Sequence, residues 1–302
     1  MSRRPAPLRP RLAATAPLLV ALAVIGPLLA ACGSESVGAG SAGAGAAGSP
    51  TPTPVTDPGM DGVRITSFTG PGDSAISAAY EVTNDGTEAL TYSVIFTFTS
   101  SDGGSMGNKN VSVRDLAPGK TARGTIQADQ LPSSAPLVTG AKVSQVLKVP
   151  AAEAPAEPGT CPASGIRVNT DEGEAAMGLR VVGLHLDNCG TGTYTVEGYP
   201  SLELLDKNHK PVTGIRILKG SSEITTGAGP DEQPRPITLK PGESASANLV
   251  WRNTTQSGTP VNVPYVRIHA KPGAAPVMVT PGLDLGTTGK LGVRPWKKTE
   301  TR

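Results

Sequence analysis

The chain has 302 residues and a formal net charge of +2 at pH 7. Four of its arginines lie in residues 1–31, which contain no acidic residue, so removing that segment leaves a net charge of −2. No basic stripe occurs in the remaining sequence. This charge balance argues against nucleic acid as a partner.

The first 32 residues have the three parts of a lipoprotein signal peptide. Arg3, Arg4, Arg9 and Arg11 form the positive region, residues 12–29 form the apolar region, and Leu29-Ala30-Ala31-Cys32 forms the cleavage box. Cleavage after residue 31 would make Cys32 the lipid-carrying first residue, and two acyl chains are enough for stable anchoring. We therefore predict a signal peptide over 1–31 and a lipid anchor at the extracellular face of the cell membrane.

An uncleaved transmembrane anchor is the main alternative. The uncharged stretch from Leu12 to Ala31 has 20 residues, about the length that spans a bilayer. Pro17 and Pro27 interrupt it, and no Lys or Arg follows until Arg64, so a stop-transfer signal is missing. A free secreted protein is a further alternative. The export route also stays open, because Ser2-Arg3-Arg4 is only a weak twin-arginine signal.

Two segments of low complexity divide the rest of the chain. Residues 32–61 are mostly Gly, Ala, Ser, Pro and Thr, a composition that predicts a disordered linker with an end-to-end distance of roughly 30 Å. Residues 150–160 form a second, Pro/Ala/Glu-rich linker. The segments 62–149 and 161–297 are each long enough to bury a core of their own, so we predict two domains.

Both predicted domains alternate apolar and polar residues with a period of two, as half-buried strands do. Gly, Pro, Asn and Asp end these runs, and no convincing amphipathic helix occurs. The pattern predicts an all-β protein with two tandem antiparallel β-sandwiches, the first of them Ig-like by analogy of fold. Three sets of residues are each expected to share one buried face: Tyr92, Val94, Phe96 and Phe98; Val182, Leu184 and Leu186; Ala245, Ala247, Leu249 and Trp251.

Two short motifs recur in both domains. Residues 80–87 (YEVTNDGT) correspond to 184–191 (LHLDNCGT), and residues 116–122 (LAPGKTA) correspond to 239–245 (LKPGESA). The second motif predicts a type II Pro-Gly turn that begins an alternating strand. The sequence leaves open whether the domains are true repeats or only use the same turn chemistry.

Cys161 and Cys189 remain once Cys32 is assigned to the lipid. An even pair in an exported chain predicts a disulfide, and closing this loop would stabilise the second domain by roughly 3 kcal/mol. A redox or metal-binding pair is the alternative. The sequence has no CxxC spacing and no histidine cluster beside these cysteines, which disfavours that alternative.

The chain carries no recognisable catalytic motif. It lacks HExxH, GxSxG and Ser-x-x-Lys, and Gly286-Thr-Thr-Gly289-Lys290 fits a glycine-rich turn better than a phosphate loop. His185, His209 and His269 are far apart in sequence and are expected at the surface. We therefore predict no catalytic residues, no metal site and no cofactor.

The two tryptophans differ in their surroundings. Trp251 falls on an inward strand face, which predicts a core position. Trp296 lies beside Arg294, Lys297 and Lys298, so it is expected either to cap the edge of the domain or to contact a partner.

A series of short motifs follows in order along the second domain. They are Asn188-Cys-Gly-Thr191, Gly198-Tyr-Pro200, Leu204-Leu-Asp206, Leu239-Lys-Pro-Gly-Glu243, Val250-Trp-Arg-Asn253, Leu283-Asp-Leu-Gly-Thr-Thr-Gly289 and Trp296. In these motifs the second domain resembles an actinobacterial domain of unknown function that is common in secreted proteins and lipoproteins. The resemblance implies a disulfide-bearing β-sandwich on the cell surface and assigns no activity.

These observations favour a non-enzymatic, lipid-anchored surface protein whose sandwiches bind an envelope protein, a cell-wall polymer or a small ligand. The alternative is an accessory or enzymatic envelope factor whose site assembles only in three dimensions, for instance from Asp206, His209 and Glu243. The sequence does not identify the ligand, the biological process or the oligomeric state.

Overall fold

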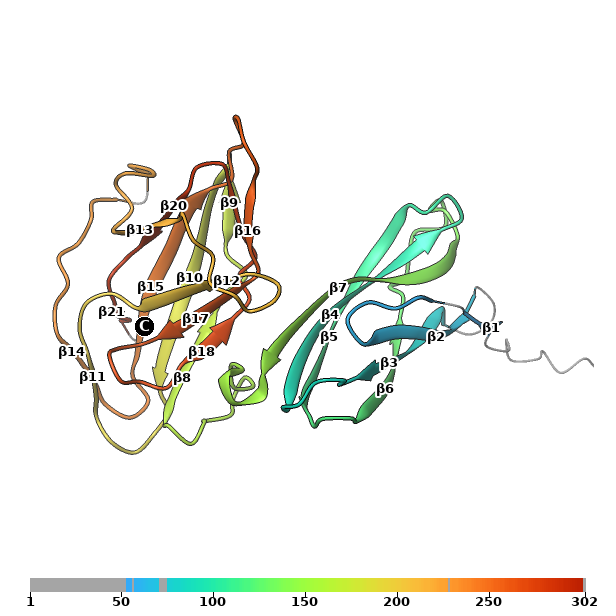
Figure 1. The fold of residues 1–302 in the computed structure, drawn as a ribbon, viewed down its shortest axis with the longest axis horizontal. Helices are drawn as coiled ribbons and strands as arrows, with labels where there is room; N and C mark the ends of the chain where they lie inside the picture. Colours follow the sequence, from blue (N-terminus) through green and yellow to red (C-terminus); the bar gives the residue numbers. More distant parts are fainter. Residues whose placement is uncertain (1–52, 56, 71–74, 228, 301–302) are drawn as a thin grey trace, which may run out of the picture. The chain divides into compact units, whose positions relative to one another are not determined.

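The structure is a computed structural model that describes residues 53–55, 57–70, 75–227 and 229–300 (Figure 1). They all fall within one compact unit, residues 47–302. The predicted signal peptide, Cys32 and most of the predicted first linker lie outside the described residues. The described part is all-β, as predicted, with one 3₁₀ turn, η1 (Ala151–Glu153), and no α-helix. Within it, no helix has the length and apolar character needed to cross a membrane.

The first sandwich consists of two antiparallel sheets that pack around one core. The first sheet has the strand order β1-β2-β3-β6 and the second has the order β5-β4-β7. The strands are β1 (Thr53–Pro54), β2 (Val63–Thr69), β3 (Ser77–Thr83), β4 (Leu90–Ser100), β5 (Ser105–Leu116), β6 (Thr121–Gln127) and β7 (Val138–Pro150).

Strand β4 shows how the sequence builds this core. Tyr92, Val94, Phe96 and Phe98 are all buried, as the alternation predicts. The Phe96 ring lies 4.9 Å, centroid to centroid, from that of Tyr80 on β3, so the contact crosses between the two sheets. Because β4 pairs with both β5 and β7, its backbone groups are satisfied on both sides.

The predicted first linker is too long at its C-terminal end. Thr53 and Pro54 form an edge strand that pairs with Phe68 and Ser67 of β2. The Asp57 carboxylate then accepts hydrogen bonds from the backbone N–H groups of Gly59 (3.1 Å) and Ile65 (2.9 Å). A proline can occupy an edge strand because no partner is needed for the N–H that it lacks. Residues 53–55 and 57–61 therefore belong to the first sandwich.

The second sandwich is built on a seven-stranded sheet with the order β13-β20-β15-β10-β8, in which β21 also pairs with β15 and β9 with β10. A three-stranded sheet, β12-β17-β18, and the two-stranded pairs β11-β14 and β16-β19 complete it. The strands are β8 (Ile166–Thr170), β9 (Glu174–Ala176), β10 (Leu179–Asn188), β11 (Tyr194–Val196), β12 (Ser201–Leu205), β13 (Arg216–Lys219), β14 (Ile237–Leu239), β15 (Ser244–Arg252), β16 (Val261–Val263), β17 (Tyr265–His269), β18 (Val277–Val279), β19 (Leu283–Gly286), β20 (Lys290–Val293) and β21 (Lys297–Lys298).

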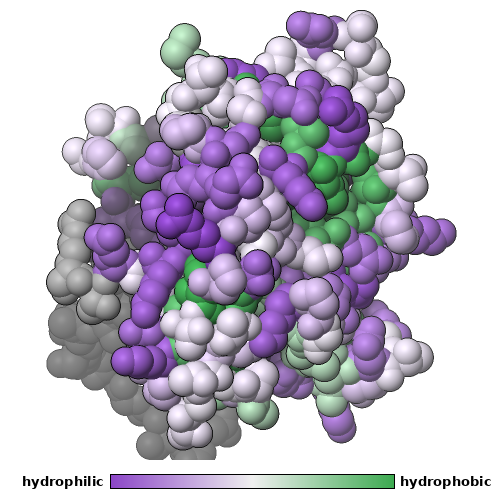
Figure 2. All heavy atoms as spheres, turned by 90° about the vertical axis from the view of Figure 1, so that its left-hand side faces the viewer, coloured by the Kyte–Doolittle hydropathy of each residue, from purple (hydrophilic) through white to green (hydrophobic). Residues whose placement is uncertain are grey.

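Strands β10 and β15 form the centre of this sheet. The residues predicted on their inward faces, including Leu184, Leu186 and Leu249, are buried in one cluster. Trp251 is also buried there, and its indole Nε1–H donates to Oδ1 of Asp284 at 2.8 Å. The face of the molecule in Figure 2 is largely hydrophilic, with smaller hydrophobic areas between the hydrophilic residues.

Candidate ligand-binding groove

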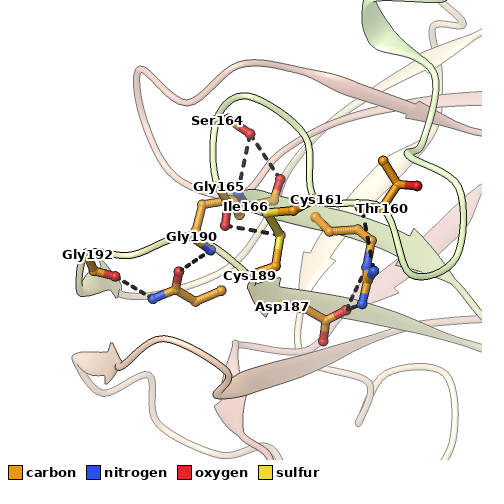
Figure 3. Close-up of a disulfide and its surroundings, with 11 residues drawn as sticks. Thr160, Cys161, Ser164, Gly165, Ile166, Asp187, Cys189, Gly190 and Gly192 are labelled. Atoms are coloured by element: carbon orange, nitrogen blue, oxygen red, sulfur yellow. Dashed lines mark hydrogen bonds and ion pairs between the residues drawn. A yellow bond between two sulfur atoms is a disulfide. The ribbon is translucent and has the colours of Figure 1, made fainter.

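A disulfide joins the start of the second sandwich to the end of β10 (Figure 3). Cys161 and Cys189 are bonded with their Cα atoms 5.7 Å apart, which is the predicted pairing. The backbone N–H groups of Cys189 and Gly190 both donate to the carbonyl of Gly165, at 3.0 and 2.9 Å. A Cβ on Gly165 would come within 3.1 Å of the Gly190 Cα, so this close backbone crossing favours glycine. The crossing places residues 162–168 along one side of a groove.

Asn188 closes the same corner from inside. Its side chain is buried, and Nδ2 donates to the carbonyls of Leu239 (2.9 Å) and Gly192 (2.8 Å). Its Oδ1 accepts from the Gly190 N–H at 3.2 Å, and its backbone carbonyl accepts from the Gly242 N–H at 2.7 Å. This one residue therefore ties the end of β10 to the end of β14 through its side chain, and to the Pro-Gly turn that precedes β15 through its backbone carbonyl.

Asn84 makes the same four contacts in the first sandwich. Its Nδ2 donates to the carbonyls of Leu116 (2.6 Å) and Glu88 (2.8 Å), and its Oδ1 accepts from the Gly86 N–H at 2.9 Å. The Gly119 N–H donates to its carbonyl at 2.7 Å. The two recurring motifs thus form one structural corner in each sandwich. The sequence comparison found the motifs but not the function of the asparagine, which is to join them.

The groove has a volume of about 510 Å³, in the range of small-molecule sites. Its lining comes from four segments: the predicted second linker with η1, the chain up to and including the start of β8, one residue of β11, and the β17–β18 connection. Most of the lining side chains are apolar and small. The lining residues are Ala152, Ala154, Ala156, Pro162, Ala163, Ser164, Ile166, Arg167, Val168, Tyr194 and residues 270–277.

Two cations and one aromatic ring give the groove its polar chemistry. The Lys271 Nζ lies 4.0 Å from the centroid of the Tyr194 ring and donates to the carbonyl of Thr195 at 2.9 Å. Burial raises the pKa of the Tyr194 hydroxyl, so this group stays protonated at neutral pH. The Arg167 guanidinium donates two hydrogen bonds, of 3.1 and 2.9 Å, to the Asp187 carboxylate, which compensates its charge. No carboxylate occurs among the described lining residues.

The predicted second linker is held in place beside the groove. The Glu153 carboxylate accepts a 2.8 Å hydrogen bond from Arg267, which also pairs with Glu203 at 2.7 Å. These contacts raise the pKa of the Arg267 guanidinium, and the hydrogen bond to Glu153 contributes most. Ala151 N–H donates to the Ala89 carbonyl, and Arg114 donates to the Pro155 carbonyl. The alanines of this segment therefore form a defined wall, which composition alone does not predict.

The three histidines have separate partners. The His185 side chain is about half exposed, and its Nε2 lies 3.3 Å from Oδ2 of Asp171. His269 Nδ1 lies 2.9 Å from the Ala274 carbonyl oxygen. His209 differs from the predicted surface histidine, because its Nε2 lies 2.9 Å from the Lys148 carbonyl and its ring packs edge-on against Tyr265. The described residues contain no group of three or more His, Cys, Asp or Glu side chains placed to bind a metal.

The structure places Asp206 and His209 in one turn, where the His209 N–H donates to the Asp206 carbonyl at 2.9 Å, but it gives Glu243 other partners. Asp206 accepts from the backbone N–H groups of Asn208 and Lys210, and these bonds contribute to its lowered pKa. Glu243 pairs instead with Lys298 at 2.7 Å, and this contact is the main cause of its lowered pKa. The Asp206 carboxylate is thus engaged in its own turn, and the Glu243 carboxylate is engaged by a lysine 55 residues further along the chain.

Trp296 is a core residue, and this burial contradicts the predicted partner contact. Its side chain is 3% exposed, and the indole Nε1–H donates to the Ala270 carbonyl at 2.9 Å. The flanking cations lie elsewhere: Lys297 and Lys298 pair with Glu232 and Glu243. The capping alternative is therefore the correct one. Ala270 also lines the groove, so the hydrogen bond from Trp296 supports this lining residue from the core side.

The sequence contained one usable signal for the groove. Lys271-Pro272-Gly273 has the composition of a turn that joins two strands. However, β8 and β11, which line the groove together with this turn, are far away from it in sequence. No pattern within the sequence joins these three segments.

Comparison with known proteins bears on this sandwich alone. No curated protein matches the chain. The model of one protein family matches residues 161–297, the segment for which the sequence indicated a domain of unknown function. That family is described as "Domain of unknown function (DUF4232)", and residues 161–297 are similar to it.

Proposed function

We propose that this is a non-enzymatic, lipid-anchored protein at the extracellular face of the cell membrane, whose second sandwich binds a ligand of the cell envelope. The observation that carries the binding role is the groove of about 510 Å³ with its apolar walls. The signal-peptide pattern and Cys32 support the anchor. A tethered binding domain needs a preformed site and no catalytic group, and the groove supplies such a site.

The lining residues suggest the class of ligand. Small apolar side chains leave room for a narrow apolar chain, and the Tyr194 ring provides a flat contact surface. Lys271 uses one of its three donors on Thr195, so its ammonium can still bind an anionic or carbonyl group. We therefore propose a ligand with an apolar segment and a nearby anionic group, such as a short peptide with a free carboxylate.

Photocrosslinking in intact cells tests the binding role. A photoreactive phenylalanine analogue placed at Ala163 or Ala275, two exposed lining positions, is expected to capture an envelope component. The same analogue at Ser257, which is exposed and is not a lining residue, is the matched control. Lys271→Gln should reduce capture at both groove positions because it removes the cation.

The binding role would be rejected if Ser257 captured the same component as the groove positions. It would also be rejected if neither groove position captured anything while the protein was present at its normal level. Soluble mature protein offers a second measurement, since the groove should bind the apolar anion anilinonaphthalene sulfonate and Lys271→Gln should weaken that binding.

Replacing Cys32 by alanine tests the anchor. We expect complete loss of labelling by a radioactive or alkyne-bearing fatty acid and release of the protein from the membrane fraction, because the diacyl group is the proposed stable anchor. Ser34→Ala, two residues away, is the control and should change neither. Retention of Cys32→Ala in the membrane would contradict the lipid anchor and favour an uncleaved apolar segment.

A further inference from the structure

The loop that joins β6 to β7 exposes two leucines. The side chain of Leu137 is 68% exposed and that of Leu131 is 38% exposed. Pro132 and Pro136 are also exposed, and no charged residue occurs from Gln130 to Ala141. Hairpin-like connections in soluble domains are normally polar, so two solvent-exposed leucines in one uncharged loop call for a partner. We call residues 130–137 the leucine loop.

The leucine loop lies at the end of the first sandwich where the chain enters it. Thr53 pairs with Phe68 near the end of β2, Thr69 pairs with Ser77, and Ser77 pairs with Gln127, the last residue of β6. Strand β1 runs antiparallel to β2, so its first residue is the one nearer this end. The loop and the start of β1 therefore share one end of the sheet.

The length of chain between Cys32 and this end is short. Twenty residues, 33–52, separate the predicted lipid anchor from Thr53. A Gly/Ser-rich coil of this length has an end-to-end distance of roughly 25 Å. A surface within that distance of the bilayer meets it at a high effective concentration, so even a weak apolar contact becomes populated.

Charge near the leucine loop favours an apolar contact over an electrostatic one. Asp129 at the start of the loop pairs with Lys109 of β5, so the two charges compensate each other. Asp102, in the neighbouring β4–β5 turn, has a lowered pKa because Ser100 and the Gly104 N–H bond to it, and it stays ionised. An excess of positive charge, which anionic lipids would attract, is missing from this part of the described structure.

We propose that the leucine loop docks on the bilayer surface, with Leu131 and Leu137 inserted at the boundary between headgroups and acyl chains. The inference rests on the proposed lipid anchor, which would bring this end of the sandwich to the membrane. It goes further by adding a second, apolar membrane contact. Two leucines give only reversible insertion on their own, and the tether makes that insertion effective.

An environment-sensitive label tests the proposal. The mature chain carries Ser134→Cys labelled with nitrobenzoxadiazole, and a polyhistidine tag replaces Cys32. The tag binds the protein to phosphatidylcholine vesicles that contain a nickel-chelating lipid. We expect blue-shifted emission and a several-fold lower rate of dithionite reduction than for the same protein without vesicles. Because the contact is apolar, high salt should not reverse the shift.

Variants separate insertion from simple proximity. Leu131→Ser/Leu137→Ser should restore the reduction rate measured without vesicles, whereas Ile217→Ser, which changes an exposed apolar residue of the second sandwich, should not. A label that is reduced equally fast with and without vesicles would overturn the proposal. So would a label that is already protected in solution, since the loop would then be covered by this chain or by a second copy.

The tag supplies the tether in this experiment, so its result does not depend on lipidation at Cys32. Loss of label protection with normal fatty-acid labelling would reject the docking and leave the anchor in place. Protection without fatty-acid labelling would reject the anchor alone. The two proposals can therefore fail separately.

Discussion

Replacing Asn188 by alanine is expected to lower the free energy of unfolding of the second sandwich by about 4 kcal/mol. The substitution removes the side-chain amide that bonds to the carbonyls of Leu239 and Gly192, whereas the Gly190 N–H keeps its bond to the Gly165 carbonyl. A buried polar group without a partner costs roughly 1–3 kcal/mol. The change also opens a small cavity where the amide was. Urea unfolding followed by tryptophan fluorescence is the measurement.

Tryptophan fluorescence reports the second sandwich specifically, because both tryptophans, Trp251 and Trp296, lie there. Asn84→Ala makes the equivalent change in the first sandwich and should shift the transition seen by circular dichroism more than the one seen by fluorescence. Asn262→Ala, at an exposed position, should cost less than about 0.5 kcal/mol. A loss below 1 kcal/mol for Asn188→Ala would show that the corner does not depend on this side chain.

Removing the disulfide through Cys161→Ser/Cys189→Ser is expected to cost about 3 kcal/mol. The bond closes a loop between residues 28 apart, so its loss mainly increases the conformational freedom of the unfolded chain. We expect a lower urea midpoint, measured by the same fluorescence assay. Capture by the photoreactive group at Ala163 should also fall, because this residue lies two positions from Cys161 in the groove wall.

Reductant provides the internal control for the disulfide. Dithiothreitol should lower the urea midpoint of the wild-type protein to that of the double variant and should leave the double variant unchanged. Cys32→Ala must be present in both proteins, so that no other thiol contributes. If thiol titration of the unreduced, denatured protein found two free thiols, the bond would be absent and the prediction would fail.

Much of the fold could be predicted because strand patterning is local. Alternation placed Tyr92, Phe96, Leu184 and Trp251 correctly in the core, since each side chain's face depends only on its position along its own strand. The cysteine pair was predictable by counting. The Ig-like character of the first domain remains an analogy of fold and a prediction.

The predictions that were wrong rested on local composition, which does not specify the contacts that a residue makes. The Pro/Thr-rich residues 53–61 were assigned to a disordered linker, yet Thr53 and Pro54 pair with β2, and the Asp57 carboxylate accepts a hydrogen bond from the backbone of β2. Trp296 lies among cations in sequence and was therefore weighed as a partner contact. The structure buries it, because the chain end folds back so that its indole reaches the Ala270 carbonyl.

The sequence by itself determined the strands, the disulfide pair and the two motifs that recur in each sandwich, and it predicts a lipid anchor at Cys32. Each of these depends on residue types at short or regular spacing. Only the tertiary structure decided that Asn188 reaches Leu239, 51 residues away, and that β8, β11 and the β17–β18 connection enclose one groove. Such contacts depend on how strands pair across the sheets, and the free energy of that pairing is shared among many residues distant in sequence.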